Sequence, residues 1–162
     1  MAREEEPAGR RVAREARALI ATPGVEVLGK ISPDGRWIAY TGQYEAGEQV
    51  YVQPFPSLAG RWQVSRSGGS AALWSRDGRE LFFVNGDQLL AVPLKPAPVF
   101  SPGEPRPLFR IERPSALEWS DIYDVSPDGK RFIVLARQKD PKNAARIDVI
   151  LNFGKRLAES AP

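Results

Sequence analysis

The segment Ser32-Pro33-Asp34-Gly35, which leads through Arg36 into Trp37-Ile38-Ala39-Tyr40, decides the fold. Proline fixes φ for a type I turn, an aspartate side chain bonds back to the turn backbone, and glycine accepts a left-handed conformation. Such a turn joins the strand before it to the strand after it as a hairpin. We therefore interpret Asp34 and Gly35 as turn-forming residues rather than as ligands.

The same turn recurs twice further along the chain. Ser75-Arg76-Asp77-Gly78 and Ser126-Pro127-Asp128-Gly129 match the first segment, and the three serines are 43 and then 51 residues apart. A spacing of about 40–45 residues is typical of four-stranded propeller blades, with insertions in the loops. The sequence therefore predicts a repeated blade, and it gives Asp77, Gly78, Asp128 and Gly129 the same role in the turns.

The strands that follow the turns are apolar at every position. They are Trp37–Tyr40, Leu81–Val84 and Phe132–Ala136. A strand that is apolar on both sides must be covered on both faces of its sheet. Blades stacked face to face around an axis supply that environment.

Further segments complete the predicted blades. A strand before the turn is predicted over Val25–Ile31, Ala71–Trp74 and Asp121–Val125. We predict an all-β fold of three four-stranded antiparallel blades, which together make a half-propeller over residues 18–157. The expected boundaries are blades at about 24–66, 70–110 and 120–153, an outer strand for another blade at 18–22, a short N-terminal helix or flexible tether at 1–17, and a tail at 158–162.

Composition excludes several classes of site. The chain has 162 residues, 42% of them apolar, a net charge of +3, and neither cysteine nor histidine. Disulfides, thiol nucleophiles, the Ser-His-Asp triad and the usual zinc sites are therefore absent, and we expect no metal and no cofactor. The charge is too small to indicate a nucleic-acid partner, and no apolar run approaches the roughly 18 residues of a membrane span. The acidic start, Glu4–Glu6, does not fit a signal peptide, which makes the cytoplasm the default location.

These motifs resemble the TolB-like, PD40-type (WD40-like) repeats of β-propellers, as in the propeller that follows the kinase domain of many bacterial serine/threonine protein kinases. The resemblance runs from about Leu19 to Leu157, and it rests on the three turns together with Val50–Pro56, Pro105–Phe109 and Val149–Asn152. It implies a ring of six blades, of which this chain holds three. It also implies a domain outside the membrane in relatives that carry a transmembrane segment, so an extracytoplasmic location stays open. No kinase function follows, because the chain has no Gly-x-Gly-x-x-Gly, His-Arg-Asp or Asp-Phe-Gly motif.

A chain that forms only half of a propeller ring is expected to associate with other chains. Three blades leave apolar faces and strand edges exposed, and closed two-fold symmetry turns three blades into six. The third repeat offers no convincing fourth strand after Ile147–Leu151, so we expect residues 18–22 of a second copy to supply it. The result is a six-bladed homodimer with strand exchange. The alternative is a fragment that aggregates or that needs other blades.

The loops at one end of the predicted ring are the expected binding region, because propellers present inter-blade loops there. The side chains best suited to a ligand or peptide are Tyr44, Arg66, Glu118 and Trp119. Aromatic and arginine side chains often dominate recognition, although Trp119 fits equally well as a packing residue between blades. We expect a non-catalytic module that binds a protein, a peptide or a small ligand. The alternatives are a carboxylate-based hydrolase at the channel mouth and a remnant propeller without a specific partner.

Overall fold

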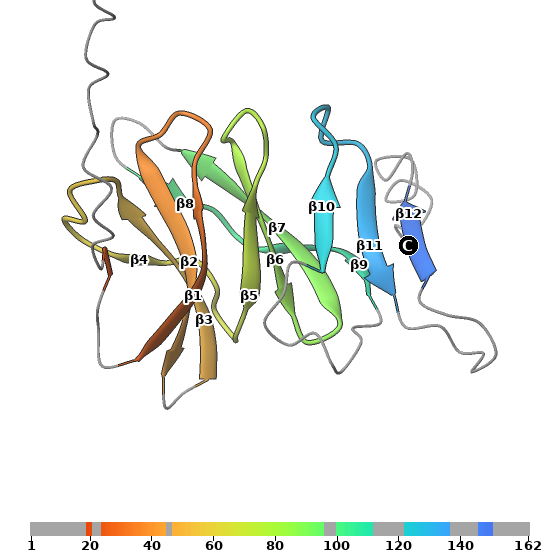
Figure 1. Cartoon of the computed structure of the whole chain (residues 1–162), viewed down its shortest axis with the longest axis horizontal. Helices are drawn as coiled ribbons and strands as arrows, with labels where there is room; N and C mark the ends of the chain where they lie inside the picture. The colour runs from red at the N-terminus through yellow and green to blue at the C-terminus, as the bar shows by residue number, and fades with distance from the viewer. Residues whose placement is uncertain are drawn as a thin grey trace, which may run out of the picture.

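The computed structural model describes residues 19–20, 24–44, 47–95, 100–111, 122–136 and 146–150, with side chains as far as Leu135. Every regular element in these ranges is a β-strand, and all strand pairs are antiparallel. The strands form three separate sheets that follow one another along the chain (Figure 1). The predicted all-β fold is confirmed.

The sheets keep sequence order from strand to strand. The first sheet contains β1 (Val25–Ile31), β2 (Trp37–Tyr44), β3 (Gly47–Pro54) and β4 (Trp62–Gln63). The second contains β5 (Ser70–Trp74), β6 (Glu80–Asn85), β7 (Gln88–Lys95), β8 (Ser101–Pro102) and β9 (Arg106–Arg110), with both β8 and β9 paired to β7. The third contains β10 (Tyr123–Val125), β11 (Phe132–Ala136) and β12 (Arg146–Ile150).

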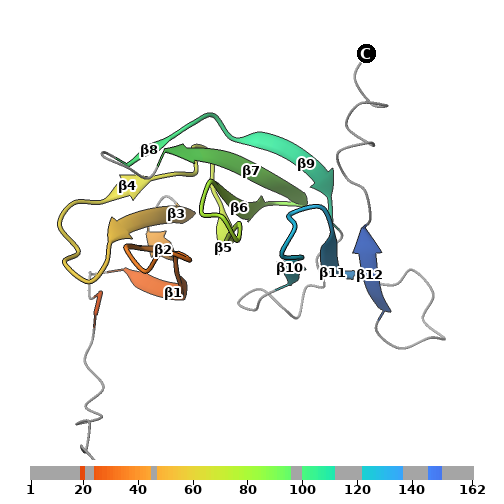
Figure 2. The same ribbon diagram turned by 90° about the horizontal axis from the view of Figure 1, so that it is seen from above.

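The three sheets stand side by side along an arc (Figure 2). The first strand of each sheet, β1, β5 or β10, lies on the inner side of this arc, and the later strands of the first two sheets lie on its outer side. Two details differ from the expected four strands per blade. The second sheet gains the short β8 inside the Pro-rich connection, and the described part of the third sheet has three strands. The expected segments 1–17 and 158–162 lie outside the described residues, as does 18–22 except for Leu19 and Ile20.

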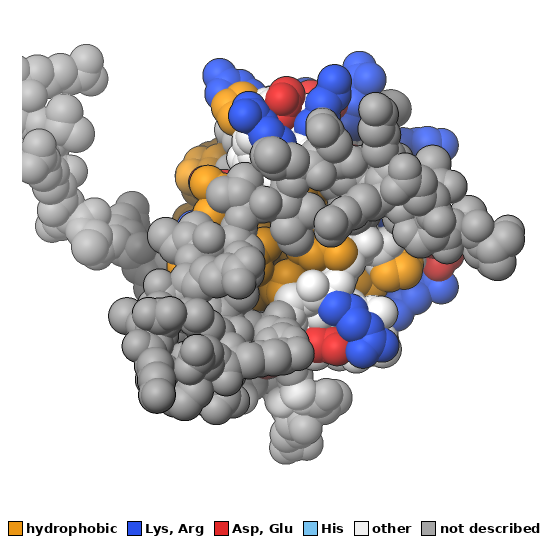
Figure 3. Space-filling model, turned by 90° about the vertical axis from the view of Figure 1, so that its right-hand side faces the viewer, with side chains coloured by type: hydrophobic (Ala, Val, Ile, Leu, Met, Phe, Trp, Pro, Cys, Tyr) orange, Lys and Arg blue, Asp and Glu red, His pale blue; other side chains and the backbone are white. Residues whose placement is uncertain are grey.

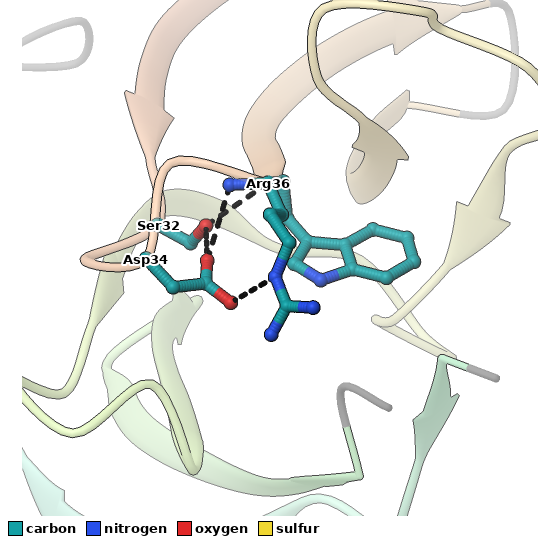
Figure 4. A network of polar contacts seen from close by, with 4 residues as sticks. Ser32, Asp34 and Arg36 are labelled. Atoms are coloured by element: carbon teal, nitrogen blue, oxygen red, sulfur yellow. Dashed lines mark hydrogen bonds and ion pairs between the residues drawn. The ribbon is translucent and has the colours of Figure 1, made fainter. Parts of the chain in front are cut away.

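The three turns share one set of hydrogen bonds, and Figure 4 shows the network of the first turn. The Gly35 backbone N–H donates to the Ser32 carbonyl oxygen at 2.9 Å, which closes the turn. Ser32 Oγ donates to Asp34 Oδ1 at 2.6 Å and accepts from the backbone N–H of Trp37 at 3.0 Å. Asp34 Oδ1 also accepts from the Arg36 backbone N–H at 3.1 Å. The serine hydroxyl therefore links the turn to the strand that follows it.

The other two turns repeat these bonds around Ser75–Asp77 and Ser126–Asp128. The three turn glycines have φ of 72°, 69° and 68°, a conformation that glycine adopts at little cost. The serine hydroxyl lowers the pKa of each turn aspartate most, and backbone N–H groups add to this effect at Asp77 and Asp128. The carboxylates thus serve the turn as hydrogen-bond acceptors.

Two apolar clusters hold the sheets together, one in each gap. Between the first and second sheets, Val50 and Val52 pack with Leu81 and Phe83. Between the second and third sheets, the side chains are those of Phe82, Val84, Leu89, Leu108, Ile122, Phe132 and Val134. Alternate residues of β6 therefore enter opposite clusters, and the middle sheet is covered on both faces as its apolar sequence predicts.

A bulge in β5 ties all three sheets together through backbone groups. The register of β5 against β6 shifts between Ser70 and Leu73, and Ala71 has φ of 55°. The Ala71 N–H donates to Thr41 Oγ1 of the first sheet at 3.2 Å. The hydroxyl of Tyr123 in the third sheet donates to the Ala71 carbonyl oxygen at 2.7 Å. Both side chains are buried, so each bond satisfies a group that water does not reach.

Candidate functional site: the outward faces of the end sheets

The first sheet has one face packed on the second sheet and one face turned away from it. Ala39 belongs to the cluster between the two sheets. Because side chains alternate along a strand, its neighbours Ile38 and Tyr40 lie on the opposite face, together with Tyr51, which is paired with Tyr40 across the sheet. We call this side the outward face of the first sheet.

Four side chains on this face form a cluster, which we name the Tyr–Arg cluster: Tyr40, Tyr44, Tyr51 and Arg61. The Tyr40 and Tyr51 rings are stacked with centroids 5.8 Å apart, and Tyr44 meets Tyr51 edge-on at 5.6 Å. The Arg61 guanidinium carbon lies 4.6 Å from the centroid of the Tyr51 ring and 5.5 Å from that of Tyr44. Arg61 Nη1 also donates to the Tyr44 hydroxyl at 2.8 Å. Aromatic faces and one hydroxyl thus hold a guanidinium in a fixed place.

Two glycines leave room for the Tyr44 ring. A Cβ on Gly42 would lie 2.7 Å from Tyr44 Cε2 and 3.1 Å from Tyr51 Cε2. A Cβ on Gly24 would lie 2.8 Å from Tyr44 Cε1. The ring can therefore lie back along the sheet, where it reaches both Tyr51 and Arg61.

Burial sets the protonation behaviour of the cluster. Tyr40 is 1% exposed and Tyr51 is 7% exposed, and this burial raises the pKa of both phenols. Burial opposes the charge of Arg61, yet its pKa is raised because Tyr44, Tyr40 and Tyr51 favour the guanidinium cation. The buried Tyr40 hydroxyl makes no hydrogen bond of good geometry, although Arg61 is close enough to act on its pKa. The cluster thus presents a guanidinium cation beside two phenols, Tyr40 and Tyr51, whose neutral form burial favours.

The outward face of the third sheet is aliphatic. Phe132 and Val134 enter the cluster against the second sheet, so Ile133 and Leu135 lie on the other side of β11. Ile133 is 48% exposed, and its cross-strand partner Asp124 is exposed beside it. Hydrophobic side chains are visible on the described surface at this end of the molecule (Figure 3). A cavity of about 340 Å³ continues from Ile133 and Leu135 to Lys30 of the first sheet.

The predicted site residues have separate partners. Tyr44 belongs to the Tyr–Arg cluster. Arg66 forms an exposed ion pair with Glu104, which joins the connection after β4 to the loop before β9. Glu118 and Trp119 lie outside the described residues.

The loop end expected to bind a ligand does contain a cavity, of about 270 Å³. Glycines and short polar side chains from three connections line it: Gly47, Glu48, Gln49, Ser67, Gly68, Gly69, Ser70, Asn85 and Gly86, with Val84. Asn85 Nδ2 donates to Ser67 Oγ at 3.1 Å on its wall. This cavity lies at the end of the sheets, apart from the packed faces.

Sequence reasoning missed Arg61, Tyr40 and Tyr51 as candidate residues. Tyr40 and Tyr51 look like ordinary core aromatics in the sequence, because their strands are apolar throughout. The available signal was alternation: when Ala39 faces the second sheet, Tyr40 must face away from it. Arg61 precedes the two-residue β4, and only the register of β4 against β3 brings it next to Tyr51.

Within the described residues, no group of three or more His, Cys, Asp or Glu side chains could hold a metal ion. A search of the same residues for a helix long and apolar enough to cross a membrane found none.

Comparison with known proteins places the fold. No protein-family model matches the sequence. No curated protein matches it either. Among solved structures, the chain is similar to TolB from Acinetobacter baumannii, with a TM-score of 0.64 and 16% identity over 89% of this chain and 34% of that one. The β-propeller domain of the trilobed protease from Pyrococcus furiosus, described as having an open velcro topology, matches with a TM-score of 0.46 and 16% identity over 76% and 39% of the two chains.

The chain therefore spans about a third of the length of the TolB chain that it matches. A structural match at 16% sequence identity indicates a shared fold and does not indicate a shared activity. The repeated turns, the antiparallel sheets along an arc and the match to TolB agree with one another. The protein has a TolB-like, propeller-type fold that corresponds to part of a propeller.

Proposed function

We propose that this chain is a non-catalytic propeller module for binding or scaffolding, and that a second copy of the chain closes its ring. One observation carries the proposal. Ile133 is 48% exposed, whereas Phe82, at the same position of the preceding repeat, is 2% exposed because the third sheet covers it. The same position of the repeat is therefore covered in the second sheet and about half exposed in the third.

The repeat also indicates which kind of sheet surface would cover Ile133. Residues three and five positions after each turn glycine face the sheet earlier in the chain: Leu81 and Phe83 meet the first sheet, and Phe132 and Val134 meet the second. Residues four and six positions after it face the next sheet, as Phe82 and Val84 do.

By this pattern, one outward face corresponds to a face that packs against an earlier sheet, and the other corresponds to a face that packs against a later sheet. Ile38 and Tyr40 occupy positions that meet an earlier sheet, and Ile133 and Leu135 occupy positions that meet a later one. A head-to-tail contact between two copies joins one face of each type, twice, about a two-fold axis. This arrangement repeats the packing rule already used inside the chain.

Strand exchange remains part of the proposal. Residues 18–22 of one copy would add a strand beyond β12 of the other, as a fourth strand for a sheet whose described part has three. The supporting argument is the sequence pattern together with the three described strands of that sheet.

For recognition of a protein, peptide or small ligand, the proposed region is the loop end, where the 270 Å³ cavity is lined by polar groups. The alternative of a carboxylate hydrolase has no specific support. Within the described residues the buried polar side chains are serines and a threonine, and no aspartate or glutamate is buried.

The test is the mass in solution by light scattering after size exclusion, at several loading concentrations. We expect a species of twice the 17.9 kDa chain mass that dissociates on dilution. A species of one chain mass at all concentrations would overturn ring closure by a second copy, and so would aggregates of undefined size.

A further inference from the structure

We propose that Arg61 forms a carboxylate-binding site in the ring-closing interface, and that an acidic side chain of the second copy fills it. This inference rests on the proposed function, and it adds the chemistry of the contact. Three observations carry it: the guanidinium forms no ion pair with a described carboxylate, the cluster holds it in place, and the tyrosines that it contacts lie where a neighbouring sheet packs.

Arg61 differs from most other described arginines. Five of them pair with carboxylates of the same chain: Arg36 with Asp34, Arg66 with Glu104, Arg106 with Glu80, Arg110 with Asp87, and Arg131 with Asp128. The partners of Arg61 are the three tyrosines. None of the ion pairs among the described residues includes Arg61, although Glu26, which pairs with Gly42 on the same face, acts electrostatically on Tyr40.

The geometry leaves hydrogen-bond donors for a ligand. A guanidinium carries five N–H donors in a planar fork, and the Tyr44 hydroxyl takes one of them. The buried Tyr40 hydroxyl beside it has a donor without a hydrogen-bond acceptor. A carboxylate has two acceptor oxygens and matches such a fork better than a neutral group does.

The position of the Tyr–Arg cluster indicates which molecule would supply the carboxylate. Tyr40 pairs with Tyr51 across the first sheet, and the equivalent pair in the second sheet is Phe83 with Leu90. Phe83 and Leu90 pack against the first sheet, which precedes them in the chain. Tyr40 and Tyr51 therefore lie where an earlier sheet packs, which in a closed ring is the third sheet of the second copy.

Closure would cover the tyrosine rings against which the Arg61 guanidinium lies, and would remove water from that side of the guanidinium. A buried cation without an acceptor is costly, so the interface must bring an anion to it. Tyr40 and Tyr51 cannot do this, because burial raises the pKa of both phenols and so favours their neutral form. An acidic side chain of the partner copy meets the requirement, and it gives the contact a charge-dependent specificity.

The experiment is sedimentation equilibrium of the full chain, with the dimer dissociation constant measured for wild type, Arg61→Gln and the control Arg110→Gln. Arg110 is also exposed, but it already pairs with Asp87. We expect Arg61→Gln to weaken dimerisation by about tenfold or more, and Arg110→Gln to change it by less than about twofold. Arg61→Lys keeps the charge without the fork and should fall between wild type and Arg61→Gln.

The outcomes separate the two proposals. A monomeric wild type overturns ring closure and, with it, this site. A dimer whose constant is the same in Arg61→Gln overturns the site and leaves ring closure standing. A monomer that binds an acetylated Asp-Phe dipeptide through Arg61, measured by calorimetry, overturns the second copy as the source of the carboxylate. Circular dichroism of each variant shows whether a loss reflects misfolding.

Discussion

The outward faces of the first and third sheets derive from the same repeat, yet they present different chemistry. On the first sheet Tyr40 is stacked with Tyr51 and is 1% exposed. On the third sheet Ile133 is 48% exposed. We infer that most of the apolar area gained on closure comes from the third sheet, and that the polar selectivity comes from the first.

The largest expected effect is that of a charge placed on the aliphatic face. Ile133→Asp puts a carboxylate where the second copy is expected to bury an aliphatic side chain, so dimerisation should weaken by more than about a hundredfold. Because Ile133 is half exposed in the single chain, the free energy of unfolding of the monomer should change by less than about 1 kcal/mol. Sedimentation and urea unfolding measure the two quantities.

The matched control for this change is Val25→Asp. Val25 is 56% exposed and pairs with Gln43, which lies on the same side of β2 as Ala39 and not on the outward face. A control variant as monomeric as Ile133→Asp would show that the effect is not specific to the outward face.

Next in size is the comparison of two buried tyrosines, one inside the chain and one on the outward face. The Tyr123 hydroxyl donates to the Ala71 carbonyl, so Tyr123→Phe leaves a buried acceptor unsatisfied and should cost about 1–3 kcal/mol of unfolding free energy. The Tyr40 hydroxyl makes no such bond, so Tyr40→Phe should cost the monomer less than about 1 kcal/mol. Equal losses in urea unfolding would contradict the assignment of these two hydroxyls.

A smaller effect is expected from the space under Tyr44. In Gly42→Ala the new methyl group would meet the rings of Tyr44 and Tyr51, and moving them should cost about 1 kcal/mol and displace Arg61. In the control Gly29→Ala the new methyl group would lie 3.5 Å from Ile38 Cδ1, an ordinary contact. Dimer dissociation constants and melting temperatures compare the two; a Gly42→Ala variant indistinguishable from the control would show that the ring position does not matter.

The smallest effect concerns the turns, which are common to all three sheets. The Ser75 hydroxyl lowers the pKa of Asp77 in the folded state. The resulting stabilisation is present above the unfolded-state pKa of about 3.9 and disappears as the pH falls through the folded-state pKa. Asp77→Asn should therefore lose about 0.5 kcal/mol at pH 7, since the carboxylate is exposed, and should differ less from wild type below pH 3. Urea unfolding at both pH values checks this; an equal difference at both would contradict the linkage.

Local residue patterns predicted the fold well. The repeated turn and the apolar strands gave β1 and β11 with their observed bounds, because turn chemistry and two-sided burial act over a few residues. The short β8 was missed, since its two residues, Ser101 and Pro102, resemble a loop. The bulge at Ala71 was also missed, because its positive φ is held by Thr41 and Tyr123 from other sheets.

The candidate site was harder to predict. Tyr44 was singled out as a loop residue, yet its ring lies back along the outward face because Gly42 and Gly24 leave space for it. Arg61 directly precedes β4, which is the last strand of the first sheet in the order β1-β2-β3-β4. Only the pairing register of β4 places Arg61 beside the tyrosines. Such contacts depend on which residues share one face of a folded sheet, and spacing along the chain does not show this.

The head-to-tail contact can be tested most directly by cross-linking, because the chain has no cysteine of its own. Ile31 pairs with Ile38 on the outward face of the first sheet. In the repeat, Ile31 occupies the same position as Trp74, and Ile133 occupies the same position as Ala39. Trp74 and Ala39 lie in one cluster between adjacent sheets, so Ile31 and Ile133 of two copies are expected to lie close together. We expect a short bismaleimide to join Ile31→Cys to Ile133→Cys when the two variants are mixed and re-equilibrated, and to leave each variant alone largely unlinked. Equal cross-linking of Ile133→Cys with itself, or no product in the mixture, would contradict ring closure by opposite faces.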